Sequence, residues 1–146
     1  MDENVDAGAS GAEPASLYTH KVLLVEDYAA NVLVATSFLE HFGLQYEVAT
    51  NGTKAVELVK TGAFDVVLMD VQMHGMNGFE ATQAIRQHEA DTKLPRLPII
   101  GMTAHALAGD RERCVSAGMD DYIAKPFNPD ELRQKIFHYL KIDAAA

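Results

Sequence analysis

Between residues 21 and 141, short apolar runs alternate five times with segments whose apolar residues recur every three or four positions. The runs predict strands at residues 21–25, 44–48, 64–69, 97–102 and 119–124. The segments between and after them predict helices at residues 29–42, around 55–59, at 79–88 and 110–117, and from 129 onward. Strand–helix alternation with short connections predicts a doubly wound α/β fold, a parallel sheet with right-handed crossovers and helices on both faces.

The spacing of apolar residues also predicts which faces of the helices contact the sheet. The first helix should end at Gly43, a residue suited to the position just after a helix. Its expected sheet-facing residues are Ala30, Val34, Phe38 and Phe42. The last helix should begin after Asn128, with proline in its first position and an acid in the third. Its expected sheet-facing residues are Leu132, Ile136 and Leu140.

Composition excludes several classes of protein. The net charge of −9 argues against non-specific nucleic-acid binding, so no direct nucleic-acid partner is expected. The single cysteine, Cys114, cannot form an internal disulfide, which favours a reducing cytoplasm as the location. No apolar stretch approaches the ~18 residues that a membrane span needs, and the N-terminus lacks a signal-peptide layout. No membrane contact by this segment is therefore expected.

Residues 1–20 differ in composition from the rest of the chain. They are rich in alanine, glycine, serine and acids and show no apolar periodicity, which predicts a disordered leader or linker. A short docking arm is the alternative. We expect one folded domain at residues 21–141, a size that supports its own core, and a short tail at 142–146.

Polar side chains follow four of the predicted strands. Glu26 and Asp27 follow the first, Asp70 the third, Thr103 the fourth and Lys125 the fifth. The carboxyl ends of parallel strands share one edge of the sheet, where open α/β folds bind ligands. Three carboxylates at close range need a cation, and either the lysine or Mg²⁺ would supply one. For the first two acids, helix capping or simple solvation is the alternative.

Asp70 has the strongest functional signal in this group. It follows a buried strand and precedes a loop, residues 71–78, that contains two glycines. A carboxylate in this position can act as a nucleophile and form an acyl phosphate when a metal and a lysine neutralise the transferring group. Thr103 would donate a hydrogen bond to a phosphate oxygen and Lys125 would supply the positive charge.

From about residue 21 to residue 141, the chain resembles the receiver domain of two-component signalling. The resemblance rests on Glu26-Asp27, on the stretch 69–73 with Gly78, on the stretch 102–104, and on Tyr122 with Lys125-Pro126. It implies a flavodoxin-like three-layer sandwich, with five parallel strands in the order 2-1-3-4-5 and five helices. The residues of these motifs are most similar to those of receivers in hybrid histidine kinases.

The resemblance also implies a role for each site residue. Asp70 would accept a phosphoryl group from a histidine kinase or a histidine-phosphotransfer protein. Asp27, Asp70 and the main-chain carbonyl of Gln72 would bind Mg²⁺, with Glu26 acting through water. Thr103 and Lys125 would contact the phosphoryl oxygens. In this family, such a domain catalyses its own phosphorylation and autodephosphorylation without turning over an external substrate.

Two further implications concern the residues around the phosphoryl site. Tyr122 matches an aromatic residue that moves inward together with the threonine on activation. The peptide bond before Pro126 is expected to be cis. Gln72 and His105 occupy positions that tune phosphoryl lifetime in the family, although a loop histidine without a role is the alternative for His105.

Three residues depart from the usual receiver pattern. His74 stands where proline is common, Asn77 replaces a frequent aspartate, and Tyr28 stands where asparagine or aspartate is common. None of the three removes a catalytic group. They affect the expected rate and lifetime of phosphorylation.

Val32 and Leu33 add apolar surface to the first helix, off its predicted sheet-facing stripe. In relays of this family the first helix docks the phosphodonor, so the two residues are candidates for a partner surface. Scattered surface apolar residues are the alternative explanation.

Three functions compete at this point. The leading one is a phosphoacceptor receiver, either a single-domain regulator or, as the motifs favour, the receiver portion of a hybrid kinase. An interaction module that is never phosphorylated is the second. An aspartyl-nucleophile phosphohydrolase is the third, and it would need an aspartate where this chain has Gln72.

Overall fold

The computed structural model of the chain describes residues 19–104 and 108–142. Strands and helices alternate as the sequence predicts. In chain order they are β1 (Lys21–Val25), α1 (Ala29–His41), β2 (Gln45–Ala49), α2 (Gly52–Val59), β3 (Val66–Asp70), α3 (Gly78–Thr92), β4 (Ile99–Thr103), α4 (Ala108–Ala117), β5 (Asp121–Ala124) and α5 (Pro129–Leu140). The predicted leader and tail lie almost entirely outside the described residues.

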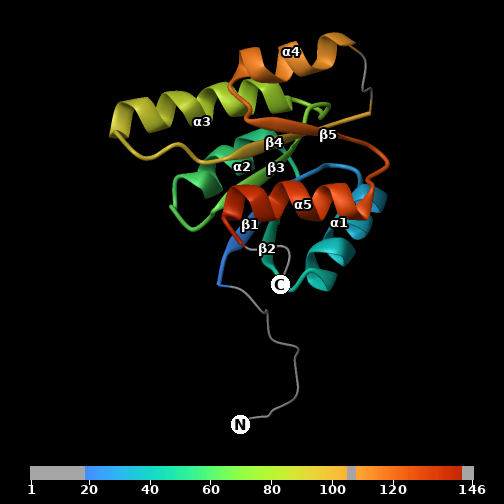
Figure 1. Cartoon of the computed structure of the whole chain (residues 1–146). Helices are drawn as coiled ribbons and strands as arrows, with labels where there is room; N and C mark the ends of the chain where they lie inside the picture. Colours follow the sequence, from blue (N-terminus) through green and yellow to red (C-terminus); the bar gives the residue numbers. More distant parts are fainter. Residues whose placement is uncertain (1–18, 105–107, 143–146) are drawn as a thin grey trace.

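The five strands form one parallel sheet in the order β2-β1-β3-β4-β5. Both the predicted α/β class and the strand order implied by the resemblance are therefore confirmed. Figure 1 shows α1 and α5 on one side of the sheet and α3 and α4 on the other. The register pairs Val25 with Met69 and Thr103 with Ala124, so the carboxyl ends of the strands lie along one edge.

Each face of the sheet carries its own core. Alternate strand residues point to opposite faces, so Val22 packs with α1 and α5 while Leu23 packs with α2, α3 and α4. All five residues of β3 are buried, as the continuous apolar run predicts. Burial on both faces holds the central strands rigidly and with them the residues at their carboxyl ends.

The predicted face of α1 is partly wrong. Phe42 is buried and Phe38 partly so, but Ala30 is exposed and Val34 is 46% exposed. The buried face consists instead of Ala35, Thr36, Leu39 and Phe42, with Val32 packed against the same core. Each helical residue turns by about 100°, so a spacing of four drifts by about 40° at every step, and the predicted stripe leaves the sheet toward its N-terminal end.

Local signals at the helix ends behave as expected. Gly43, just after α1, has a φ of 80°, a conformation that favours glycine. The Asn128 side chain accepts a hydrogen bond from the Glu131 N–H at 3.1 Å, and proline begins α5. Leu132, Ile136 and Leu140 are all buried, as predicted.

Helix α3 is longer than its apolar pattern predicts. It continues past residue 88 and ends at Thr92. The next residue, Lys93, caps the helix and has a φ of 57°. The added turn is polar, so hydrophobic periodicity cannot detect it. Within that turn, Glu89 accepts two hydrogen bonds from Arg86 at 3.0 Å. Within residues 19–104 and 108–142, no helix is apolar and long enough to cross a bilayer.

Candidate functional site

Three carboxylates meet at the carboxyl edge of the sheet. Glu26 and Asp27 follow β1 and Asp70 ends β3, and these strands are neighbours. One oxygen from each side chain lies within 4.8 Å of the others. Glu26 is 1% exposed and Asp70 is 3% exposed, whereas Asp27 is half-buried. Ionised groups this close and this poorly hydrated repel one another strongly unless a cation is present.

Lys125 supplies one positive charge to this cluster. Its Nζ lies 2.7 Å from Glu26 Oε1 and 3.2 Å from Asp70 Oδ1. Its main-chain N–H donates to the Thr103 carbonyl at 2.8 Å, which holds the lysine beside β4. The bond between Lys125 and Pro126 is cis, as the resemblance implies. The sequence-predicted acids and lysine therefore do converge.

Burial raises the pKa of Asp70 to about 6 from its ordinary value of 3.8. The N–H of Gln72, 3.1 Å from Asp70 Oδ1, and the ammonium of Lys125 both act to lower this pKa. Nearby Glu26 raises it further. Burial is the largest of these effects, so the raised pKa reflects mainly the loss of water around the carboxyl.

The donor set fits Mg²⁺. This ion prefers hard oxygen ligands and is usually bound through one or two carboxylates with several waters retained. Three carboxylate oxygens within 4.8 Å of one another offer such ligands, and three carboxylates beside the ammonium of Lys125 leave an excess of negative charge. A divalent cation would relieve that excess.

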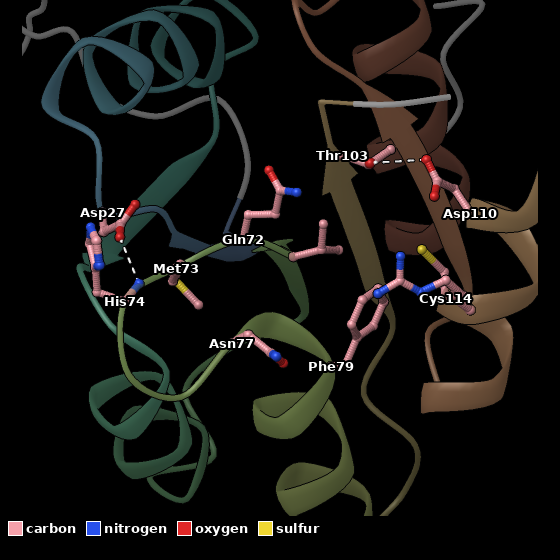
Figure 2. A pocket seen from close by; sticks show the side chains of 11 residues that line it. Asp27, Gln72, Met73, His74, Asn77, Phe79, Thr103, Asp110 and Cys114 are labelled. Atoms are coloured by element: carbon pink, nitrogen blue, oxygen red, sulfur yellow. Dashed lines mark hydrogen bonds between the residues drawn. The ribbon is translucent and has the colours of Figure 1, made fainter. Parts of the chain in front are cut away.

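An open cavity of about 580 Å³ adjoins the cluster. Asp27, Gln72 and Thr103 line it, and Asp27 belongs both to the cavity wall and to the acidic cluster (Figure 2). The His74 N–H donates to Asp27 Oδ2 at 3.2 Å, a hydrogen bond that proline in this position would not make. The cavity gives small molecules a route to the acidic edge.

The other predicted residues occupy different surroundings. Thr103 ends β4 and is 4% exposed, and its hydroxyl donates to Asp110 Oδ2 at 3.4 Å. Tyr122, on β5, packs partly buried against the core of α2, α3 and α4. Leu33 is 69% exposed, whereas Val32 is half-buried, so the expectation that both lie off the sheet-facing side is wrong for Val32. His105 lies outside the described residues.

Sequence analysis missed several residues of the cavity wall. Asp110, Arg113 and Phe79 line it, and the Arg113 guanidinium lies 5.0 Å from the Phe79 ring centroid. Asp110 lies only seven residues after Thr103, in the first turn of the next helix. An acid in a first helical turn is common for reasons of helix stability alone, so its proximity to the threonine gives no sequence signal.

Asp70→Asn is expected to stabilise the metal-free protein at neutral pH. A carboxyl whose pKa is raised in the folded state does not lower the free energy of unfolding below pH 3.8, its pKa in the unfolded chain. The loss of stability grows as pH rises from 3.8 through about 6, the pKa in the folded state. The two values differ by an amount equivalent to about 3 kcal/mol, so a gain of about 1–3 kcal/mol is expected above about pH 7. Urea unfolding in EDTA at a series of pH values measures it.

The matched control is Glu57→Gln, which removes an exposed carboxylate from α2. Its unfolding free energy should follow that of the wild type at every pH. If Asp70→Asn also follows the wild type across the whole range, Asp70 carries no ionisation cost and the electrostatic account of the site is wrong.

Comparison with known proteins places this geometry in a family. Residues 22–137 match the model of the response regulator receiver domain. The chain is 42% identical over 126 residues to the sensor protein GacS of Pseudomonas syringae pv. syringae, covering 86% of this chain and 14% of that protein. It is 38% identical over 120 residues to the signal transduction histidine-protein kinase BarA of Escherichia coli, covering 81% and 12%. The chain thus spans a small part of these curated relatives.

Two solved structures share the fold and sequence similarity. One is the receiver domain of sensor histidine kinase PA1611 from Pseudomonas aeruginosa, with a magnesium ion in its active-site cleft (TM-score 0.76, 37% identity, 85% and 99% of the two chains). The other is the Saccharomyces cerevisiae Ssk1 receiver domain in a complex with the histidine phosphotransfer protein Ypd1 (TM-score 0.79, 30% identity, 83% and 88%).

The family model covers all of the sheet except its first residue, Lys21, and includes the edge at which Asp70 lies. The chain belongs to the receiver domain family of two-component signalling.

Proposed function

We propose that this receiver accepts a phosphoryl group on Asp70 from a phosphohistidine of a histidine kinase or a histidine-phosphotransfer protein. The observation that carries the proposal is the buried Asp70 carboxylate, with Lys125 Nζ at 3.2 Å and two further acids in the same cluster. A carboxylate nucleophile flanked by a fixed cation suits phosphoryl transfer, in which charge neutralisation and positioning supply most of the catalysis.

Mg²⁺ is the proposed cofactor. Asp27, Asp70 and the main-chain carbonyl of Gln72 would hold it, and Glu26 would contribute through water. When bound, the ion neutralises charge on the transferring group. The acidic cluster supports this assignment, as does the magnesium-bound cleft of the similar PA1611 receiver.

The residues of the chain divide the remaining work. An Asp70 oxygen attacks phosphorus, so an O–P bond forms while the N–P bond to the donor histidine breaks. Lys125 neutralises the phosphoryl oxygens, and Thr103 donates its hydroxyl proton to one of them. Tyr122 would then follow Thr103 to change the adjoining surface. Attack by water on the phosphoryl group later restores the carboxylate and releases phosphate.

The exposed apolar residues of α1 support a docking surface for the phosphodonor. Leu33 and Val34 are 69% and 46% exposed, and Tyr28, the residue just before the helix, is 63% exposed. The helix begins two residues after the acidic pair that follows β1. The similar Ssk1 receiver forms a complex with a histidine phosphotransfer protein. Val32 contributes mainly to the core, which leaves Leu33 as the residue that tests the surface.

The setting that we propose from similarity is a hybrid histidine kinase in the cytoplasm. The relatives GacS and BarA are sensor kinases of which this chain matches 14% and 12%. We therefore propose residues 21–141 as the receiver portion of such a protein, with residues 1–20 as a linker and 142–146 as a tail.

Asp70→Asn is expected to abolish labelling by a phosphorylated donor, because an amide is not a nucleophile towards phosphorus. Transfer is measured with radiolabelled histidine kinases and phosphotransfer proteins, and with acetyl phosphate in the presence and absence of Mg²⁺. Asp65→Asn, at an exposed aspartate just before β3, is the matched control and should label normally. Wild-type protein that takes no label from any donor would instead favour a non-phosphorylated interaction module.

Leu33→Glu is expected to slow transfer from a protein donor by about fivefold or more, because a charge replaces an apolar contact at the interface. Labelling by acetyl phosphate should not change, since this small donor needs no docking surface. Leu94→Glu is the control, since Leu94 is 50% exposed and precedes β4 at the opposite edge of the sheet. Equal slowing by both substitutions, or by neither, would contradict docking through α1.

Gln72 and His105 are proposed to set the lifetime of the phosphoryl group. The Gln72 side chain is exposed and lines the cavity from which water would approach. The Gln72→Ala, His105→Ala double variant should change the decay rate by about threefold or more, because side chains guide or block that water. Label remaining after donor removal measures the decay, and Gln83→Ala on α3 is the control. Identical decay in variant and wild type would refute the role.

A further inference from the structure

We propose that Asp110, in the first turn of α4, is a positioning residue that holds the Thr103 hydroxyl until Asp70 is phosphorylated. This inference rests on the proposed function and adds a residue that opposes the phosphorylated arrangement of the receiver. Asp110 would keep the receiver in its unphosphorylated arrangement by competing with the phosphoryl group for a single hydroxyl proton.

The two residues are joined across the cavity wall. Thr103 ends β4, Asp110 begins α4, and Thr103 Oγ1 donates to Asp110 Oδ2 at 3.4 Å (Figure 2). Thr103 is 4% exposed, so its hydroxyl has little access to bulk water. Both residues line the cavity that Asp27 and Gln72 also line. The hydroxyl is therefore directed to α4 from a position beside the acidic edge.

A threonine hydroxyl has one proton to donate. While that proton lies on the Asp110 carboxylate, it cannot lie on a phosphoryl oxygen. Donation to a phosphoryl group on Asp70 thus requires the bond to Asp110 to break. The two hydrogen bonds are alternatives, and they define two states of the same side chain.

The length of the bond suits a reversible role. Hydroxyl-to-carboxylate bonds are strongest at about 2.5–2.7 Å, so a bond of 3.4 Å is weak. A phosphoryl oxygen carries more charge and would outcompete this carboxylate. The Asp110 charge also opposes an anion beside Thr103. Occupation of the hydroxyl by Asp110 reduces the fraction of protein ready to bind the phosphoryl group, and the apparent affinity falls by that fraction. Repulsion by the Asp110 charge lowers the affinity further.

Release of Asp110 would change how α4 is held. Farther along the helix, Cys114 and Ala117 are buried, and the Arg113 guanidinium lies over the Phe79 ring. These contacts keep the body of α4 on the sheet. The bond from Thr103 joins the first turn to the end of β4, so phosphorylation would break this link while the rest of the helix stays packed.

A double-mutant cycle tests the competition. Asp110→Asn, Asp110→Ala and Thr103→Val are made singly, and each Asp110 variant is combined with Thr103→Val. Beryllofluoride, an analogue of the phosphoryl group, is titrated with Mg²⁺ by calorimetry. Asp110→Asn should lower its dissociation constant by about threefold and Asp110→Ala by somewhat more, because the hydroxyl loses a charged acceptor. In the Thr103→Val background both effects should be much smaller, because only the through-space charge of Asp110 remains.

Glu112→Gln is the matched control. Glu112 is an exposed acid two residues along the same helix, so the change removes the same charge from α4 without touching Thr103. Its affinity for beryllofluoride should equal that of the wild type. If Asp110→Asn tightens binding equally with and without the threonine hydroxyl, the carboxylate acts only through its charge and the inference is overturned. Unchanged or weakened binding in Asp110→Ala also overturns it.

A second measurement separates this inference from the proposed function. If the wild type binds no beryllofluoride and takes no label from acetyl phosphate, the proposed function fails. The hydrogen bond between Thr103 and Asp110 is then tested by methyl NMR of Thr103 in the unphosphorylated protein. Asp110→Ala should change the rotamer of the Thr103 side chain, and Glu112→Gln should not. An unchanged Thr103 rotamer in Asp110→Ala would by itself refute the proposal that Asp110 holds the Thr103 hydroxyl.

Discussion

Lys125 extends from the end of β5 to two buried carboxylates at the ends of β1 and β3, with Nζ 2.7 Å from Glu26 and 3.2 Å from Asp70. Charged groups this poorly hydrated persist only when they are paired, because removing an ion from water costs several kcal/mol that attraction must offset. The pairing needs β1, β3 and β5 to end at the same edge, in a sheet that does not deform. The two cores provide that rigidity, because every residue of the central strands β3 and β4 is buried.

The loop after Asp70 depends on the same edge. A Cβ atom added to Gly78 would lie 2.1 Å from the Asp70 carbonyl oxygen, closer than any real contact allows. The loop therefore returns directly against the backbone of Asp70, and only glycine fits there. The Gln72 N–H then reaches Asp70 Oδ1 and the His74 N–H reaches Asp27 Oδ2. Backbone groups of one short loop thus orient two of the three acids, which leaves other carboxylate oxygens available to a metal ion.

Helix α4 lies beside the same cavity as the acidic edge. Its first turn contacts Thr103 through Asp110, and its body packs through Cys114 into the core shared with α2 and α3. A hydrogen bond thus joins the carboxyl end of β4 to the first turn of α4. Helix α1, in contrast, carries the exposed apolar residues Leu33 and Val34 and follows the acidic pair directly in the chain.

The sequence by itself determined the strands, their parallel arrangement and the residues at their carboxyl ends, because period and order along the chain are local properties. It also predicted the caps at Gly43 and Asn128, whose chemistry involves only neighbouring residues. It misplaced the buried face of α1, since apolar residues surround that helix and only contact with the sheet selects Ala35 and Leu39. The contact of Asp110 with Thr103 and the raised pKa of Asp70 were decided by tertiary structure alone, because both depend on distances through space and on exclusion of water.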